Sequence, residues 1–167
     1  MERFIGCGAR YEPLDGPVHG YLQSSPACFA AFCRLLAAEY ESAVLMDVHR
    51  LTVDTWAIQH PGPDDDPRAV RSRGLHLARL HVEFETSRPS REINAAMLEF
   101  MRSKMTLRRL DPPKAYRITV DEVAPHAGTP SHAAKVRAWA QAAWEDWSDH
   151  HAYIRDWVNA RSGYGSG

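Results

Sequence analysis

Hydrophobic side chains recur at helical spacing from the first third of the chain onward. Between residues 27 and 41 the apolar positions Phe29, Phe32, Leu35, Leu36 and Tyr40 follow one another by three, three, one and four. Such spacing places side chains on one side of an α-helix. Pro26 directly precedes this stretch, after a pair of serines, and proline in the first turn behind a serine cap is a typical helix start. The pattern therefore predicts a helix over about 27–41.

Three further segments have helical periodicity and are separated by proline-containing loops. They are 45–60 with Val53, Trp56 and His60, 68–85 with Leu77, Leu80 and Phe84, and about 90–109 with Ile93, Met97, Phe100 and Leu107. The loops between them contain prolines within 61–63, at 89 and at 112–113, and proline stops a helix. The sequence thus predicts three more helices with short connections.

The last segment, 131–160, carries the longest apolar stripe of the chain. Its members step by three or four residues and are Val136, Trp139, Ala143, Trp147, His150, Ile154 and Trp157. A stripe of this kind predicts one continuous helix that buries a single face. On that helix His150 points inward, whereas its neighbour His151 points about 100° away.

Together these elements predict an all-α fold, a single compact bundle-like domain of about five helices over 1–160. Residues 1–25 are rich in glycine and proline and predict a looped segment packed on the body. Residues 161–167, with three glycines, predict a disordered tail.

Charge and cysteine content narrow the class of protein. The 20 basic and 21 acidic residues are scattered, with a net charge of -1, and no basic patch with interleaved aromatics is present. This composition argues against nucleic acid as a partner, and no apolar run approaches the roughly 20 residues of a membrane span. Three cysteines form no disulfide framework, so we expect a cytoplasmic protein. Cys7 is expected to be buried or incidental, and Cys28 and Cys33 to be core residues of their helix.

Common catalytic motifs are absent. There is no glycine-rich phosphate loop, no Gly-x-Ser-x-Gly elbow, no Cys-x-x-Cys pair and no His-Glu-x-x-His sequence. The unusual feature is instead the count of nine histidines, since histidine binds metals and transfers protons near neutral pH.

The surroundings of these histidines resemble a known family. The passage from His49 to Gly62, His-Arg-Leu-Thr-Val-Asp-Thr-Trp-Ala-Ile-Gln-His-Pro-Gly, is the most distinctive. Supporting pieces are Gly-Pro-Val-His at 16–19, Ser-Ser-Pro-Ala-Cys at 24–28, His-Leu at 76–77 and the stretch 139–157. Together they are similar to a largely bacterial domain-of-unknown-function family, number 5946, over about 7–158. The resemblance implies a small stand-alone domain and no known activity.

One departure from the family pattern concerns the N-terminus. Many members open with Cys-x-x-Cys-Gly, whereas here Phe4 stands at the first position and Cys7 and Gly8 remain. Because one cysteine alone does not close a tetrahedral zinc site, no N-terminal zinc knuckle is expected.

The preferred hypothesis is a histidine-rich interior site that binds a divalent transition metal of the zinc, iron or nickel class. Helical bundles hold such ions with imidazoles and carboxylates from facing helices. The predicted ligands are His49, His76 and His150, and Asp54 and His60 are predicted to act beside the metal in catalysis or as replacement ligands. His49 and His60 lie about 16 Å apart on a straight helix, so both cannot bind one ion. His19, His81, His126 and His132 are expected to be surface or loop residues.

Two alternatives remain open at this point. Five tryptophans can line a pocket of a non-catalytic domain that binds a small molecule or a protein. A histidine–aspartate pair, such as His150 with Asp54, can perform acid–base chemistry without a metal. The sequence does not decide whether the protein is an enzyme, and a small-molecule ligand is the partner that we expect.

Overall fold

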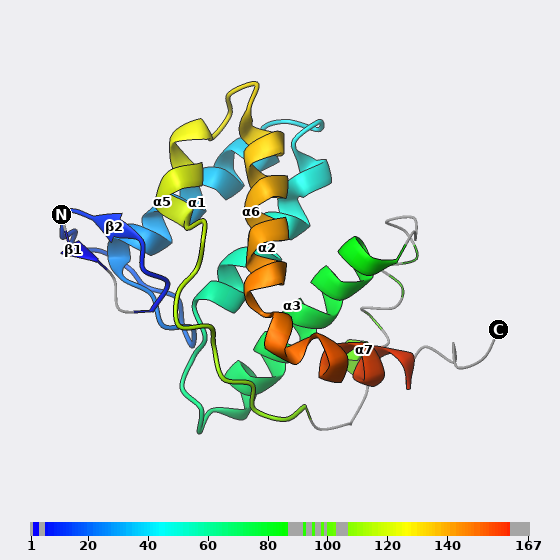
Figure 1. Ribbon diagram of the computed structural model, residues 1–167. Coiled ribbons are helices and arrows are strands. Elements are labelled where there is room, and N and C mark those ends of the chain that lie inside the picture. Colours follow the sequence, from blue (N-terminus) through cyan, green and yellow to red (C-terminus); the bar gives the residue numbers. More distant parts are fainter. Residues whose placement is uncertain are drawn as a thin grey trace.

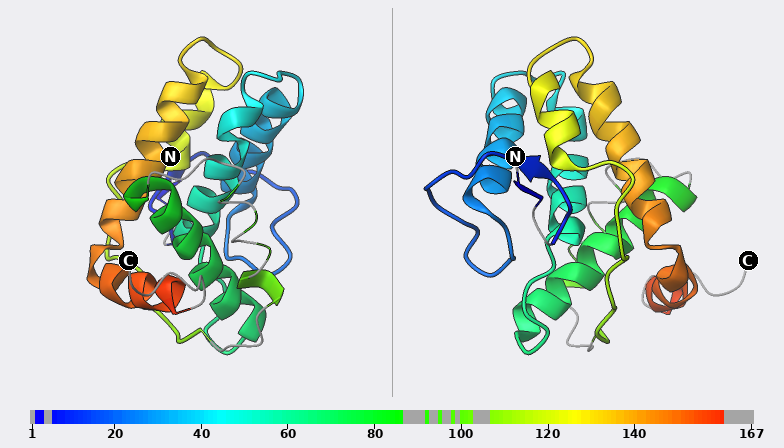
Figure 2. Two further views of the ribbon diagram at one scale, coloured as in Figure 1. Left: turned by 90° about the vertical axis from the view of Figure 1, so that its right-hand side faces the viewer. Right: turned by 60° about the vertical axis from the view of Figure 1, so that its left-hand side comes forward.

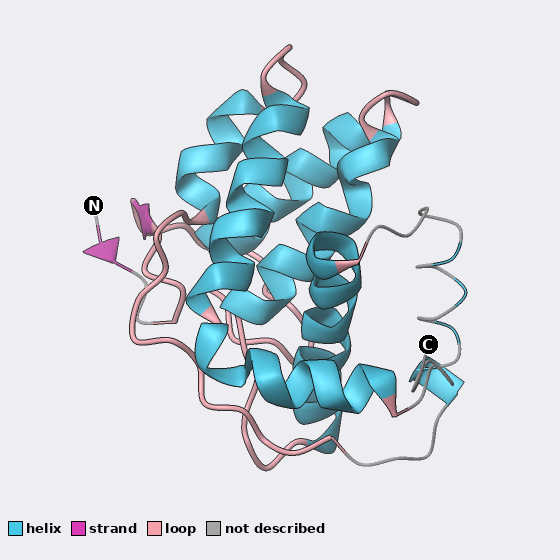
Figure 3. Ribbon diagram, turned by 45° about the vertical axis from the view of Figure 1, so that its right-hand side comes forward, coloured by secondary structure: helices cyan, strands magenta, loops and turns pink. Residues whose placement is uncertain are grey.

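The computed structural model describes residues 2–3, 6–86, 92, 95, 98, 100–102 and 107–160 of the chain. Helices make up nearly all of its regular structure (Figure 1), so the predicted all-α fold is confirmed. Figure 3 shows the helices and the two short strands beside them. Within the described ranges, no helix combines the length and hydropathy that are needed to cross a membrane.

The first three helices lie where the periodicity predicted them. Helix α1 spans Pro26–Tyr40, α2 spans Met46–Gln59 and α3 spans Pro67–Glu85. The side chain of Ser25 caps α1 by accepting the Cys28 N–H at 3.1 Å. Asp66 caps α3 in the same way, by accepting the Arg68 N–H at 2.8 Å. Each cap satisfies a backbone donor that has no partner within its helix.

Helix α2 is the centre of the domain. It packs against α1, α3 and α6, the last of which spans His132–Asp146 (Figure 2). Its residues Thr52, Asp54, Trp56 and Gln59 are all buried. A helix with neighbours on several sides buries polar as well as apolar positions, so its side chains must find hydrogen-bond partners inside the protein.

The predicted long final helix is two helices, and this prediction was wrong. Helix α6 ends at Asp146, a 3-10 turn covers Ser148–His150, and α7 spans His151–Asn159 and packs against α3. The carbonyl of Trp144, close to the end of α6, accepts a hydrogen bond from His151 Nε2 at 2.8 Å. Side chains that hydrogen-bond to the last carbonyls stabilise a helix end, so this contact stabilises the end of α6 at the break.

Short elements complete the fold. Strands β1 (Glu2–Arg3) and β2 (Arg10–Tyr11) pair antiparallel with Glu2 opposite Tyr11. The chain then runs without helix or strand to α1, as predicted for a looped N-terminal segment. Helix α5, Val120–Val123, begins with a capping box and leads into a 3-10 turn at Ala124–His126.

The predicted helix over 90–109 lies largely outside the described residues, and so do its positions Ile93 and Met97. Phe100 and Leu107 are described, and both are buried as expected. The tail at 161–167 also lies outside the described residues.

All five tryptophans are buried in the core, each at most 5% exposed; they are Trp56, Trp139, Trp144, Trp147 and Trp157. The indole N–H of Trp139 donates to Gln59 Oε1 at 3.0 Å, which ties α6 to α2. The aromatic stripe thus serves packing.

Candidate metal centre

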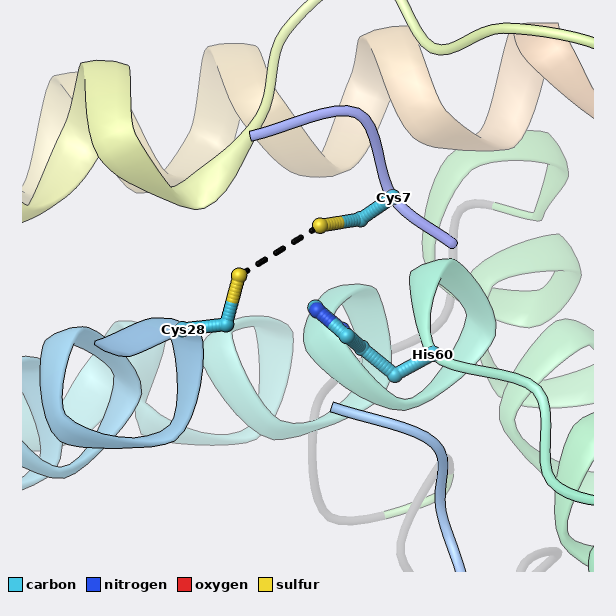
Figure 4. Close-up of side chains that lie close together, drawn as sticks. All are labelled: Cys7, Cys28 and His60. Atoms are coloured by element: carbon cyan, nitrogen blue, oxygen red, sulfur yellow. Dashed lines mark hydrogen bonds between the residues drawn. The ribbon is translucent and has the colours of Figure 1, made fainter. Parts of the chain in front are cut away.

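Three side chains from distant parts of the sequence meet where α1 begins and α2 ends. They are Cys7, Cys28 and His60, and one ligand atom from each lies within 4.8 Å of those of the other two. Figure 4 shows the three side chains pointing toward one another from the N-terminal loop, the first turn of α1 and the end of α2. All three are at most 1% exposed. We call this group the cysteine cluster.

Cys7 is placed by a tight turn of the N-terminal segment. Gly8 has a φ of 84°, which is in the left-handed region that favours glycine. This reversal brings the Ala9 N–H to 3.5 Å from Cys7 Sγ. A hydrogen bond to sulfur stabilises the thiolate form, which is the form that binds metals.

Cys28 is placed by the start of α1, two residues after Pro26. Its Sγ lies 3.5 Å from Cys7 Sγ. The pKa of Cys28 is lowered to about 5, chiefly because the Cys7 thiol donates a hydrogen bond to its sulfur, and this effect outweighs burial. The pKa of Cys7 is raised because its proton is held by Cys28. The positive end of the α1 dipole also favours a thiolate at this position.

His60 is placed by the end of α2, where it is the C-cap residue. Its Nδ1 donates to the carbonyl of Trp56 at 2.8 Å, and its ring stacks on the indole of Trp56 with centroids 4.3 Å apart. With the proton on Nδ1, Nε2 has the lone pair that a metal needs.

Two residues after His60, Gly62 fixes the path of the loop. A Cβ at this position would lie 2.2 Å from the carbonyl oxygen of Tyr21, so only glycine fits. The backbone that leaves α2 is therefore held close to the N-terminal segment.

The distance between the two sulfurs of the cysteine cluster is close to that in a tetrahedral metal site. Two sulfurs bonded to one zinc at about 2.3 Å lie about 3.8 Å apart when the bond angle is tetrahedral. The observed separation of 3.5 Å needs only a small expansion. Two thiolates and an imidazole leave one coordination position to another ligand, and Cys7 lines a cavity of about 340 Å³ together with Tyr116 and Asp121.

The five residues predicted from the sequence do not meet at one point. Of the predicted catalytic pair, His60 belongs to the cysteine cluster. His49, Asp54 and His76 border a different cavity, between α2 and α3. His150 lies apart from both, since its Nε2 donates to the backbone carbonyl of Asp111 at 2.8 Å. Its predicted inward position assumed an unbroken last helix, and the turn at Ser148–His150 removes it from that face.

Asp54 and His76 form a pair of their own. His76 Nδ1 donates to Asp54 Oδ1 at 2.7 Å, and Arg79 Nε lies 2.5 Å from Asp54 Oδ2. The pair considered from the sequence was His150 with Asp54, whereas the structure pairs Asp54 with His76.

His49 belongs to a buried network around Glu39, a residue that the sequence analysis missed. The fully buried Glu39 carboxylate accepts from His49 Nδ1 at 2.9 Å, from His132 Nε2 at 3.1 Å and from the Thr52 hydroxyl. The Gly128 N–H donates to His132 Nδ1 at 3.0 Å, which places the proton of His132 on Nε2. The network joins α1, α2 and α6.

Three single-residue expectations were wrong. Cys33 is exposed rather than in the core, because it lies on the outer face of α1. His81 and His132, expected at the surface, are 4% and 0% exposed. Burial lowers the pKa of His81, and His132 is held by Glu39.

Comparison with known proteins places the chain in a family without assigning it a function. The chain belongs to a family of unknown function, DUF5946, whose model matches residues 2–148. The resemblance drawn from the His49–Gly62 passage is therefore confirmed. No curated protein and no solved structure matches the chain.

Proposed function

We propose that the protein is a metal-binding domain that holds a transition metal ion of the zinc class through Cys7, Cys28 and His60. The observation that carries the proposal is the convergence of two thiols and one imidazole at a buried point, from three separate segments. Thiolates select zinc or similarly soft ions over magnesium or calcium. The histidine set proposed from the sequence is replaced by this cluster as the ligand set.

The surroundings support binding of an ion. The Ala9 N–H lies against Cys7 Sγ, and the Trp56 carbonyl fixes the tautomer of His60. Outer contacts of this kind orient ligands and tune the metal. The ion would join the N-terminal segment to α1 and α2, and its fourth position would be taken by water or a small ligand that enters from the cavity at Cys7.

The proposal includes a reducing compartment, the cytoplasm, because Cys7 and Cys28 must remain thiols to bind the ion. Both are free cysteines. A disulfide between them is the competing use of the same pair, and it requires the sulfurs to approach to about 2.05 Å.

The test is cobalt titration of the metal-free, fully reduced protein, prepared without a histidine tag. We expect one equivalent to give the intense thiolate-to-cobalt charge-transfer bands and the visible bands of a tetrahedral site. Cys28→Ser and His60→Gln should weaken binding at least tenfold, whereas Cys33→Ser, which removes the exposed cysteine, should leave it unchanged.

A second measurement avoids variants that unfold. In the natural chain, zinc should slow alkylation of Cys7 and Cys28 and leave that of Cys33 unchanged. Equal cobalt spectra in all variants, or zinc protection of no cysteine, would overturn the proposal. Isolation of the protein under mild reduction with Cys7 and Cys28 already joined as a disulfide would favour the competing use.

A further inference from the structure

A cavity between α2 and α3 lies away from the cysteine cluster and shares no residue with it. Its volume is about 600 Å³, within the usual range for small-molecule sites. Helix α2 contributes Met46, His49, Arg50, Val53 and Asp54, which are spaced by three, one, three and one. This is a single helix face, and the inference drawn from it does not depend on the metal proposal.

The opposing face of α3 supplies most of the charge. Arg68, Arg71 and Arg79 line the cavity together with Arg50, and Asp54 is the only carboxylate among the described residues that do so. With histidines neutral, the described lining thus has an excess of three positive charges, in a chain whose net charge is -1. Clustered positive charge between low-dielectric walls attracts anions.

Some of these charged side chains already have partners within the protein. Asp54 binds both His76 and Arg79, so it does not neutralise the other arginines. Arg68 pairs with Asp66 at 2.8 Å, and the Arg71 guanidinium donates to the carbonyl of Met101.

Arg50 differs from these arginines. It is exposed, and among the described residues no carboxylate lies within ion-pair distance of its guanidinium. His76 is oriented through Nδ1 by Asp54, and its side chain is 23% exposed. Arg50 on α2 and His76 on α3 are therefore the groups best placed to meet a ligand.

The rest of the lining is apolar. Val53 and Leu75 lie on the two helices, and Met46, Met101 and the ring of Tyr21 extend the apolar surface. A cavity that combines cationic groups with such a surface fits a ligand that has both an anionic group and a hydrocarbon part.

We propose that this cavity binds a small organic anion, a carboxylate or a phosphate monoester attached to an apolar group. Arg50 and His76 contact the anionic group. Tyr21, Val53 and Leu75 cover the apolar part.

The experiment compares four probes by isothermal titration calorimetry on the full chain. They are phenyl phosphate, hexanoate, inorganic phosphate and benzyl alcohol. At least one of the two amphipathic anions should bind at least tenfold more tightly than inorganic phosphate and benzyl alcohol, and the better of the two identifies the anionic group. Equal binding of inorganic phosphate and phenyl phosphate, with weaker binding of hexanoate, would overturn the amphipathic site.

Variants then locate the site. Arg50→Gln and His76→Gln should each weaken binding about tenfold, as expected for loss of a hydrogen bond to a charged group. Arg137→Gln removes an exposed charge from α6, away from the cavity, and should change binding less than twofold. Cys28→Ser should bind the probe normally, which separates this site from the metal centre. Equal losses in Arg50→Gln and Arg137→Gln would show non-specific charge attraction and overturn the proposal.

Discussion

The cysteine cluster and the cavity between α2 and α3 both use α2, but they differ in their exposure to water. Cys7, Cys28 and His60 are at most 1% exposed. In the cavity, the His76 and His49 side chains are 23% and 15% exposed, and Arg50 is exposed. A dry group of soft donors suits an ion that remains bound, whereas a partly open cationic cavity suits a ligand that exchanges.

The two regions also differ in how their polar groups are satisfied. In the cavity, Asp54, His76 and Arg79 form a charged network within two neighbouring helices. In the cluster, the partners come from three segments with a thiol–thiol contact at its centre. We therefore expect the cavity network to be complete without a ligand, and the cluster to gain stabilising interactions when an ion binds.

Removal of the metal should have the largest effect of the changes considered, and it should act on the cysteine cluster rather than on the cavity. A ligand at 1,000 times its Kd stabilises the native state by about 4 kcal/mol, and a domain of this size gains about 2–4 °C in Tm for each kcal/mol. Chelation should thus lower the Tm by about 8–16 °C, as measured by circular dichroism with zinc and with chelator. Cys33→Ser should show the same drop and Cys28→Ser almost none. An unchanged Tm after verified metal removal would contradict a stabilising ion.

The next largest effect concerns Glu39, whose carboxylate accepts a hydrogen bond from the cavity residue His49. Glu39→Ala leaves the buried His132 without its acceptor and Thr52 with only the more distant carbonyl of Val48, and each lost partner costs about 1–3 kcal/mol. We expect the free energy of unfolding to fall by about 3–4 kcal/mol in urea denaturation. Glu41→Ala, at an exposed position two residues later, should stay within about 0.5 kcal/mol. Similar losses in both variants would refute the importance of the network.

Helical periodicity predicted α1, α2 and α3 because each buries a regular apolar stripe. It failed at Trp147, since an apolar stripe can continue through a turn when both halves pack on the same core. The break follows from tertiary contacts of α7 with α3 and from the bond of His151 to the Trp144 carbonyl, neither of which is encoded in the stripe.

The candidate site was predicted only in part. His60 was singled out by its position at a helix end, and Asp54 and His76 were both selected, although as parts of one metal site. Cys7 was set aside as buried or incidental and Cys28 as a core residue of its helix, and only folding brings the two together. Glu39 was detectable, since it continues the inward spacing of Cys28, Phe32 and Leu35 by four residues.

Asp54→Asn should have a moderate effect and should act on the cavity alone. Arg79 is 7% exposed, and loss of the charged acceptor for Arg79 and His76 should lower the free energy of unfolding by about 1.5–3 kcal/mol. Asp47→Asn, at an exposed position in the first turn of α2, should cost about 0.3–1 kcal/mol. Cobalt binding should be unchanged in both variants. A loss of cobalt binding in Asp54→Asn would show that the two regions are not independent.

The smallest effect concerns His19, because groups in both regions act on the pKa of its ring. Burial lowers the pKa of His19 below its ordinary 6.5, and the charges of His60 and His76 lower it further. Its Nδ1 accepts the N–H groups of Tyr21 at 3.4 Å and Leu22 at 3.2 Å, and a protonated ring cannot accept them. Because the unfolded chain binds this proton more readily than the folded one, the contribution of His19 is present above pH 6.5 and lost as the pH falls below it.

An NMR titration of the His19 ring gives the sharpest comparison of the two regions. A metal ion at the cysteine cluster adds positive charge near His60 and should lower the pKa of His19 further. An organic anion in the cavity adds negative charge near His76 and should raise it. Shifts of opposite sign for zinc and for phenyl phosphate are therefore expected in the natural chain, and the zinc shift should vanish in Cys28→Ser while the phosphate shift persists. Shifts of the same sign for both additions would contradict the placement of zinc beside His60 and of the anion beside His76.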